Sequence, residues 1–514
     1  MMENLDINNS FPAILGNEEE TGMILQYGQK ILEPYELVQH LKNYIPSEFK
    51  GTDEEFLTNG FRVYPGLAVN NVSALSKNWE ILDTNLERAT PECKTPEQLA
   101  LYIRAGELLL RKIAVNFVER DSLNRPDGSK IRIQRRVVDS LGNRKGCHDN
   151  YSINLDSQYV AEDIIRHGVI LNSVMRSFLM SRVLLTGAGY VEYQNGVYFS
   201  QKIGGLVGEV DYGFTGTMAR TETSEMYNGI QRFEVRCNDI NISDWATTMR
   251  IAGVALCLAL LENGYSSDLE ELVRDEIDLT FLLFKEKANY INKINFSREG
   301  KFYLSKEQKN AASFQQRISE LTMSKLADRV DVPRYYYNSA KEIYDYYDDL
   351  RKVDAGLADI DILADRVDWA AKFSKIRSKR IESGKQSNSG SIASDIESCA
   401  LDLRYDNITI EASEGEITRI SDGFGIKLRD RGKFKNPIKQ NAVERALSTP
   451  PANTRATLRG KILSNYLVKS CDWDRVELAD SRFDDDVEIF LGPESSELNQ
   501  TQLRILSNCV KIDK

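Results

Sequence analysis

Three consecutive glutamates at positions 18–20 limit what the first part of this chain can fold into. They follow the apolar segment PAILG at residues 12–16, a composition typical of a β-strand. Because side chains alternate along a strand, Glu18 and Glu20 share one face and Glu19 points to the other. Two carboxylates on one face suit a hard cation such as Mg²⁺. A solvated acidic sheet edge is the alternative explanation.

The pattern of the remaining segments favours an α+β protein with an antiparallel sheet. Short strand-like runs occupy the first 90 residues, and Thr95-Pro96-Glu97-Gln98 has the form of a capping box that starts a helix. Further elements are expected as a strand over 130–138, helices over 157–182 and 243–262, and amphipathic helices over 266–376.

A polar stretch rich in serine and glycine at 384–394 predicts a flexible loop near a domain boundary. We therefore expect a catalytic domain over residues 1–400 and a small C-terminal domain over 401–514.

Composition argues against several functions and indicates where the protein is located. A net charge of −11 argues against a nucleic-acid binder, and three histidines are too few for a histidine-rich metal site. Seven cysteines without a CxxC pair indicate a reducing, cytoplasmic location. The N-terminus lacks the features of a signal peptide, and the longest apolar run, at 251–261, is too short to span a bilayer and predicts a buried core helix.

A series of short motifs points to a family. In chain order they are GNEEETG (16–22), LTNGFRVY (57–64), ERATPEC (87–93), DSLGNRKGCHDNY (139–151), FLMSRVLLTGAG (178–189), FSQK (199–202), RTE (220–222), RFEVRCND (232–239), NTRATLRG (453–460) and DWDRVEL (472–478). Their order and spacing resemble the Pup ligase and Pup deamidase (depupylase) family, relatives of glutamine synthetase. The resemblance extends from about residue 12 to about residue 478.

This resemblance implies a fold and a chemistry. The fold is a glutamine-synthetase-like curved antiparallel sheet with helices on its outer face, and the small C-terminal domain contributes to the nucleotide site. The chemistry uses Mg²⁺ and ATP to convert a glutamate side-chain carboxylate into an acyl phosphate, which a lysine amine attacks. The implied partners are ATP, a small acidic Pup-like protein modifier and a lysine-bearing protein.

The resemblance also assigns roles to individual residues. Those matched to the metal are Glu18, its strand partner Glu20, Tyr64, Glu87 and His148. Those matched to the nucleotide are Arg62, Thr90, Trp473 and Arg220. Arg220 and Glu222 match an arginine and a glutamate of a further family motif.

RFEVRCND adds candidates from its own pattern. Alternation places Arg232, Glu234 and Arg236 on one face, so a carboxylate that suits a metal lies between two cations that suit phosphates. The family usually has histidine at the position of Glu234. A salt-bridge ladder on an exposed sheet is the alternative.

Departures from the family pattern affect the catalytic base. Gly66 stands where the family has a catalytic aspartate, an inserted stretch follows at 67–81, and Asp83 then precedes Glu87. Either Asp83 supplies the base after this detour, or it caps a turn and the base is missing. Arg88 replaces a family tyrosine, and residues 220–224 lack an acidic and histidine-containing patch.

The distance between motifs separates the two branches of the family. Hydrolases have a long loop after the first carboxylate strand, and residues 23–56 are too few for it, so an isopeptide ligase is expected. The alternatives are a deamidase or depupylase, a phosphotransferase on the same scaffold, and a nucleotide-binding protein without catalysis.

Overall fold

The structure of the 514-residue chain is a computed structural model. It describes residues 14–27, 30–31, 41–51, 53, 55–70, 80–125, 127–137, 145–154, 168–202, 219–227, 230–276, 290–326, 329, 332–479, 486–492 and 497–512. Part of the strand expected at 12–16 and the first half of the helix expected at 157–182 lie outside these residues.

The chain forms two compact units. The sheet unit consists of Ile14–Cys147, Arg404–Lys427 and Ile438–Lys514, and the helical unit is built mainly from His148–Leu403 with Leu428–Pro437. These units differ from the division expected at residue 400. Most of the C-terminal segment groups with the N-terminal strands, because pairing and packing join residues that are far apart in sequence.

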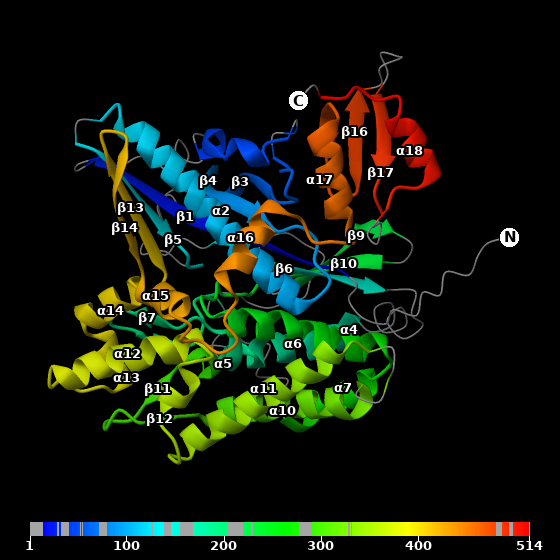
Figure 1. The fold of residues 1–514 in the computed structure, drawn as a ribbon. Helices are drawn as coiled ribbons and strands as arrows, with labels where there is room; N and C mark the ends of the chain where they lie inside the picture. Colours follow the sequence, from blue (N-terminus) through cyan, green and yellow to red (C-terminus); the bar gives the residue numbers. More distant parts are fainter. Residues whose placement is uncertain are drawn as a thin grey trace. The chain divides into compact units, whose positions relative to one another are not determined.

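The sheet unit contains most of the strands (Figure 1). Its elements are β1 (Leu15–Tyr27), β2 (Lys30–Ile31), η1 (Lys42–Tyr44), η2 (Ser47–Phe49), β3 (Arg62–Asn70), β4 (Glu80–Ala89), α2 (Pro96–Ser122), β5 (Ser129–Gln134), β13 (Asn407–Ser413), β14 (Glu416–Asp422), α16 (Gln440–Ser448), α17 (Arg455–Asn465), β15 (Val468–Cys471), β16 (Arg475–Ala479), β17 (Asp486–Phe490) and α18 (Gln500–Leu506). Strands β14, β13, β5 and β1 follow one another in the sheet, β4 pairs with β1, and β3 pairs with β4, all antiparallel.

Helix α2 packs against β1, β5 and β13 and begins where the sequence predicts. The Thr95 hydroxyl accepts a hydrogen bond from the Gln98 backbone N–H (3.1 Å), and Pro96 occupies the first turn. The Gln98 side chain accepts a hydrogen bond from the Lys94 N–H at 2.7 Å. In the expected capping box the donor would be the N–H of the next residue, Thr95.

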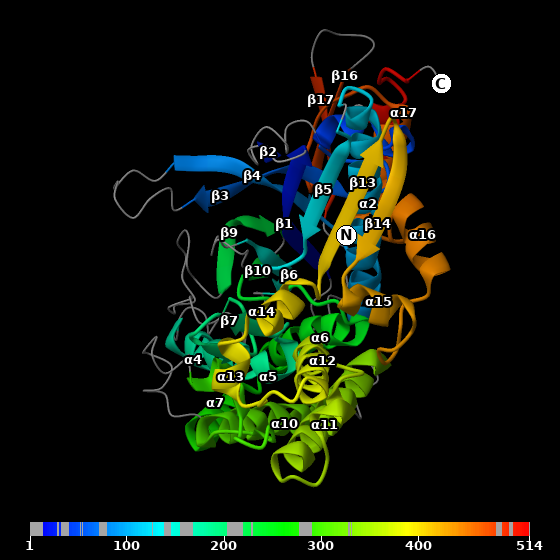
Figure 2. The same cartoon turned by 90° about the vertical axis from the view of Figure 1, so that its left-hand side faces the viewer.

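The inserted stretch after Gly66 extends a β-hairpin. Strands β3 and β4 continue to pair beyond the family motif, with Leu67 opposite Asp83 and Asn70 opposite Glu80, and Figure 2 shows the two strands side by side. A bulge between Gly66 and Leu67 interrupts the register, because one residue of β3 is matched by two of β4. Alternation therefore cannot be counted through the bulge to Asp83.

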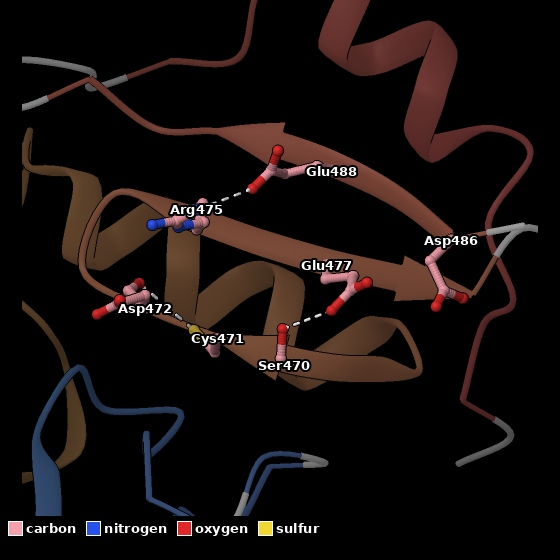
Figure 3. A pocket seen from close by; sticks show the side chains of 7 residues that line it. All are labelled: Ser470, Cys471, Asp472, Arg475, Glu477, Asp486 and Glu488. Carbon is pink, nitrogen blue, oxygen red and sulfur yellow. Dashed lines mark hydrogen bonds and ion pairs between the residues drawn. The ribbon is translucent and has the colours of Figure 1, made fainter.

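The last three strands form a separate small sheet, ordered β15–β16–β17. Its apolar face, including Val476 and Leu478, packs with Phe56 and with Ile462 of α17 in one buried cluster. Its polar face lines a hollow, shown in Figure 3, that is mainly acidic. The residues of this hollow are Ser470, Cys471, Asp472, Arg475, Glu477, Asp486 and Glu488.

The helical unit holds the remaining elements. They are β6 (Cys147–Asn154, which begins in the sheet unit), α4 (Gly168–Ser181), α5 (Val183–Thr186), β7 (Tyr190–Glu192), β8 (Gly196–Tyr198), β9 (Ala219–Tyr227), β10 (Ile230–Val235), α6 (Asp244–Glu262), α7 (Ser266–Glu276), β11 (Asn295–Phe296), β12 (Phe302–Tyr303), α10 (Lys306–Leu326), α11 (Arg334–Asp354), η4 (Ile360–Leu363), α12 (Asp368–Glu382), α13 (Ser389–Ala393) and α14 (Ile396–Leu403); α15 (Phe424–Asp430) crosses between the units.

Helix α6 is the core helix of its unit. It is long and apolar enough to cross a membrane, but 94% of its most apolar 18-residue stretch is buried within the protein. It packs against α5, α10 and α11. The α+β class with an antiparallel sheet, predicted from the sequence, is confirmed.

The segment 384–394 differs from the flexible loop expected there. It contains α13, whose N-cap residue Asn388 accepts a hydrogen bond from the Ser391 N–H at 2.9 Å. Arg380 of α12 also donates to the Gln386 carbonyl (Nε–O 2.7 Å). Serine and asparagine therefore cap a short helix here, a role for which the same composition is suited.

Candidate active site

Acidic and phenolic side chains line up across three neighbouring strands of the sheet unit. Glu20 of β1 stands opposite Glu87 of β4, which stands opposite Tyr64 of β3. In the next row, Ala89 of β4 stands between Glu18 and Arg62. The backbone register therefore brings together candidates from three separate motifs on one sheet face.

The electrostatics of Tyr64 show how close these groups are. Burial raises the pKa of the Tyr64 hydroxyl, and the charges of Glu18 and Glu87 and a hydrogen bond to Glu87 raise it further. Oxygen atoms of three side chains thus gather at a half-buried position. Mg²⁺ prefers oxygen ligands, carboxylates above all. Glu18, Glu87 and Tyr64, with Glu20 in the adjoining position, therefore have the chemistry of a magnesium site.

The opposite face of the same strands is an ionic core. Glu19 and Arg88 form a buried ion pair, and Arg135 lies 3.7 Å from the Glu19 carboxylate and 2.6 Å from Glu107 of α2. All four side chains are buried. The predicted alternation of Glu18, Glu19 and Glu20 is confirmed, and the departure at Arg88 supplies the counter-ion of Glu19.

A cluster of aromatic and arginine side chains holds the candidate nucleotide residues. The Arg62 guanidinium lies 4.6 Å from the Tyr64 ring centre and 5.0 Å from that of Phe56. It is also held by Glu55, with Nη2 at 2.8 Å from the carboxylate. The Trp473 ring meets Phe56 edge-on at 5.1 Å. Arg62 and Trp473, 411 residues apart by their numbers, therefore contact the same phenylalanine.

Thr90 has a structural partner. Its hydroxyl accepts a hydrogen bond from the Asn17 N–H at 3.0 Å, and its own N–H donates to the Asn17 carbonyl at 2.9 Å. These bonds join the end of β4 to β1 directly beside Glu18. The predicted contact of Thr90 with a nucleotide stays a prediction.

Sequence reasoning missed a group of three charged residues, one of which, Arg459, contacts Trp473. Glu92 accepts hydrogen bonds from Arg459 (3.0 and 2.8 Å) and from Arg455 (2.7 Å), two residues one turn apart on α17. The motifs ATPEC and NTRATLRG contain these residues, but neither motif indicates that they pair. The one signal in the sequence was the spacing of Arg455 and Arg459, which places two arginines on one face of a helix where they can bind the same carboxylate.

The remaining candidates form a cluster in the helical unit. Glu234 of β10 lies 3.0 Å from His148 Nδ1 and 3.0 Å from Arg236 Nε, with Arg232 at 4.0 Å. Burial would raise the pKa of Glu234, but His148 and the two arginines outweigh it and hold the pKa well below its usual range. Arg236 follows the last residue of β10. Its position on the same side as Glu234 therefore depends on their ion pair rather than on strand alternation.

Three candidates, Asp83, Arg220 and Glu222, have side chains outside the described residues. Asp83 is placed only by its backbone, opposite Leu67 in β4. Arg220 is placed by its backbone opposite Glu234, in β9. The predicted roles of all three stay predictions.

Comparison with known proteins identifies the family. Residues 30–477 match the model of a family described as Pup-ligase protein. The chain belongs to this family. The resemblance predicted from the motifs is thus confirmed, although Glu18 and Glu20 precede the matched range.

Individual family members are similar along most of their length. The chain is 24% identical over 487 residues to a Pup–protein ligase of Bifidobacterium dentium, covering 91% of this chain and 89% of the relative. It is 25% identical over 497 residues to the Pup–protein ligase of Acidimicrobium ferrooxidans, covering 91% and 93%.

Two solved structures share the fold. A complex of the prokaryotic ubiquitin-like protein Pup with its ligase PafA gives a TM-score of 0.69 at 20% identity, covering 96% of this chain and 92% of that one. The Pup ligase PafA in complex with ADP gives 0.61 at 20% identity, covering 94% and 95%.

Proposed function

We propose that this chain is an ATP-dependent ligase that joins the carboxylate of a Pup-like protein to a lysine amine. The observation that supports it best is the row formed by Glu20, Glu87 and Tyr64 beside Glu18 and Arg62. It provides oxygen ligands for a cation and a guanidinium for phosphate on one sheet face of a Pup-ligase family member.

The bonds that change define what the residues must do. A carboxylate oxygen of the modifier attacks the γ-phosphorus of ATP, the bond to the bridging oxygen breaks, and ADP leaves. A lysine amine then attacks the acyl carbon, phosphate leaves, and a base accepts the proton of the amine. The modifier and the acceptor are linked by an isopeptide bond.

The residues of the sheet unit suit the first step. Mg²⁺, which Glu18, Glu20, Tyr64 and Glu87 would hold, neutralises charge on the phosphate oxygens when bound. Arg62 is fixed by Glu55 and by two aromatic rings, so its guanidinium is oriented before a phosphate arrives. Trp473 offers an indole surface for the nucleotide base.

The base for the second step is assigned to Asp83. A carboxylate attracts the lysine ammonium and accepts its proton as the new bond forms. Gly66, at the place of the family's catalytic aspartate, favours the alternative that the phosphoryl group passes to a different acceptor.

The partners follow from the relatives. One PafA structure contains Pup and another contains ADP, and we assign a Pup-like protein and ATP to this chain in the same way. Dependence on ATP and seven cysteines without a disulfide support a cytoplasmic location.

The test combines the full chain with ATP, Mg²⁺ and a small acidic protein that ends in glutamate. We expect ADP release that depends on the terminal glutamate, and a modified lysine detected by peptide mass spectrometry. ADP release without any need for a carboxylate partner would point to a phosphotransferase. Magnesium-dependent ATP binding without turnover would point to a nucleotide-binding protein.

A further inference from the structure

Arg459 contacts Trp473 through both its backbone and its ring. Arg459 is completely buried, and its Nη1 donates a hydrogen bond to the Trp473 carbonyl at 2.8 Å. Its guanidinium also lies 5.1 Å from the centre of the indole. One side chain therefore fixes the turn that carries Trp473 and touches the ring itself.

Glu92 fixes Arg459 in turn. Two nitrogens of Arg459 donate hydrogen bonds to the two carboxylate oxygens of Glu92 at 3.0 and 2.8 Å. This paired geometry fixes the orientation of the guanidinium plane. Burial would raise the pKa of Glu92, but Arg459 and Arg455 outweigh it and lower the pKa to about 2. Glu92 therefore stays ionised near neutral pH and keeps its grip on Arg459.

Phe56 connects this group to Arg62. The Arg459 guanidinium lies 4.9 Å from the centre of the Phe56 ring, which Arg62 and Trp473 also contact. Glu92 follows the end of β4, the strand of Glu87, so its position depends on the strand that bears a candidate metal residue. The orientation of the indole is thereby tied to the strand and to the arginine of the candidate site.

We propose that Arg459, held by Glu92, is a positioning residue that orients the Trp473 indole for nucleotide binding. This inference rests on the proposed use of ATP. Arg459 touches no reacting atom in this assignment. Its loss should therefore weaken ATP binding and leave the rate of the chemical step at saturating ATP nearly unchanged.

A purely structural role for Arg459 predicts a different outcome. Removing a buried arginine leaves part of the Glu92 charge uncompensated, so Arg459→Met should lower the melting temperature in either case. Because Arg459 touches the indole, its loss changes the surroundings of Trp473 in either case. Only the positioning role predicts that ATP binding weakens as well while the protein stays folded. The measurements must therefore follow Trp473 and ATP binding together.

The experiment labels the full chain with 5-fluorotryptophan and follows its four tryptophans by fluorine NMR. Trp473→Phe assigns the Trp473 resonance, and the resonances of the buried Trp245 and Trp369 report that the helical unit remains folded. The variants are Arg459→Met, Arg459→Lys and Glu92→Gln. Arg455→Met is the matched control, because Arg455 also binds Glu92, whereas the hydrogen bond to the Trp473 carbonyl and the contact with its ring come from Arg459.

We expect Arg459→Met to shift the Trp473 resonance without nucleotide and to raise the ATP dissociation constant about tenfold, the scale of a lost cation–π contact. Arg459→Lys keeps the charge but not the paired geometry, so it should recover part of the affinity. Glu92→Gln should shift the resonance in the same direction, and Arg455→Met should leave it in place.

Two results separate this inference from the proposed function. An unmoved Trp473 resonance in folded Arg459→Met, or an unchanged ATP dissociation constant, overturns the positioning role while ATP binding by the wild type stands. Failure of the wild type to bind ATP with Mg²⁺ overturns the proposed function and the nucleotide-binding role together.

Discussion

Glu19 of β1 and Arg88 of β4 stand directly opposite each other in the sheet and join their side chains in a buried ion pair. The neighbours of both residues, Glu18, Glu20 and Glu87, point to the other face. The charge pair therefore fixes the register of the two strands that bear candidate metal residues. An arginine that departs from the family pattern performs this task here.

Removal of one partner of this pair should be costly. Arg88→Met leaves the Glu19 carboxylate buried with Arg135 at 3.7 Å, so we expect the free energy of unfolding to fall by about 3–5 kcal/mol. Urea unfolding followed by circular dichroism measures this change. In the control Lys341→Ala, which removes an exposed ion pair with Asp345, the midpoint should stay in place. Equal midpoints for wild type and Arg88→Met would show that the pair does not hold the strands.

Sequence patterns predict the local part of this arrangement. Alternation along one strand was sufficient to place Glu18 and Glu20 on one face and Glu19 on the other. The capping residues of α2 and the buried character of α6 could also be read directly, since both depend on nearby residues only.

The rest depends on contacts between distant segments. The pairing of Glu92 with Arg459 joins residues 367 positions apart, and no periodic pattern reports such a pair. The grouping of the C-terminal segment with β5 and Phe56 has the same origin, because strand pairing joins β13 to β5 and apolar packing joins the last strands to Phe56. The insertion after Gly66 could be seen in the sequence, but not that it extends a hairpin.

The Tyr64 hydroxyl is predicted to support metal and nucleotide binding. Tyr64→Phe removes a hydrogen bond to Glu87 and brings an apolar ring edge beside the two carboxylates. We expect the Mg²⁺ concentration needed for half-maximal ATP binding to rise about tenfold, the scale of a lost hydrogen bond to a charged group. Titration calorimetry of ATP at several Mg²⁺ concentrations measures this. Tyr337→Phe, at an exposed site on α11, is the control and should behave as the wild type.

Glu18 is predicted to bind the metal directly. Glu18→Ala removes a charged ligand from the face that receives the phosphates, so the free energy of ATP binding should weaken by about 1–3 kcal/mol. The same calorimetry measures this change. Glu19→Gln is the control, because Glu19 lies on the opposite face of the same strand. Glu19→Gln should lower stability without removing the Mg²⁺ dependence of ATP binding. Unaltered, Mg²⁺-dependent binding in Glu18→Ala would exclude Glu18 from the metal site.

Acid should weaken the link between Glu92 and α17 within a defined range. The pKa of Glu92 is lowered from 4.5 to about 2, so its contribution to stability is fully present above pH 4.5 and is lost as the pH falls towards 2. Over that range the free energy of unfolding of the wild type should fall by about 3 kcal/mol more than that of Glu92→Gln, because Glu92→Gln has no carboxylate to protonate at this position. Urea midpoints of both proteins at several pH values test this. Parallel curves for the two proteins would contradict it.

Asp83 decides whether this chain keeps the reaction of its family. Its backbone lies four residues before Glu87 in β4, on the far side of the bulge, so its Cα is roughly 13 Å from that of Glu87 along an extended strand. Asp83→Asn keeps the shape of the side chain and removes its basicity. If Asp83 accepts the proton of the lysine, ATP should bind normally while isopeptide formation falls by about a hundredfold or more.

The measurement pairs ATP calorimetry with mass spectrometry of the modified lysine. Asp348→Asn, at a half-exposed site on α11, is the control for a general effect of removing a carboxylate. Normal ligation by Asp83→Asn would show that the chain has discarded the aspartate base at Gly66 without replacing it from the hairpin. ATP consumption would then have to be assayed against hydroxyl and other carboxylate acceptors, because phosphoryl transfer needs the metal row and Arg62 but not a base that deprotonates an amine.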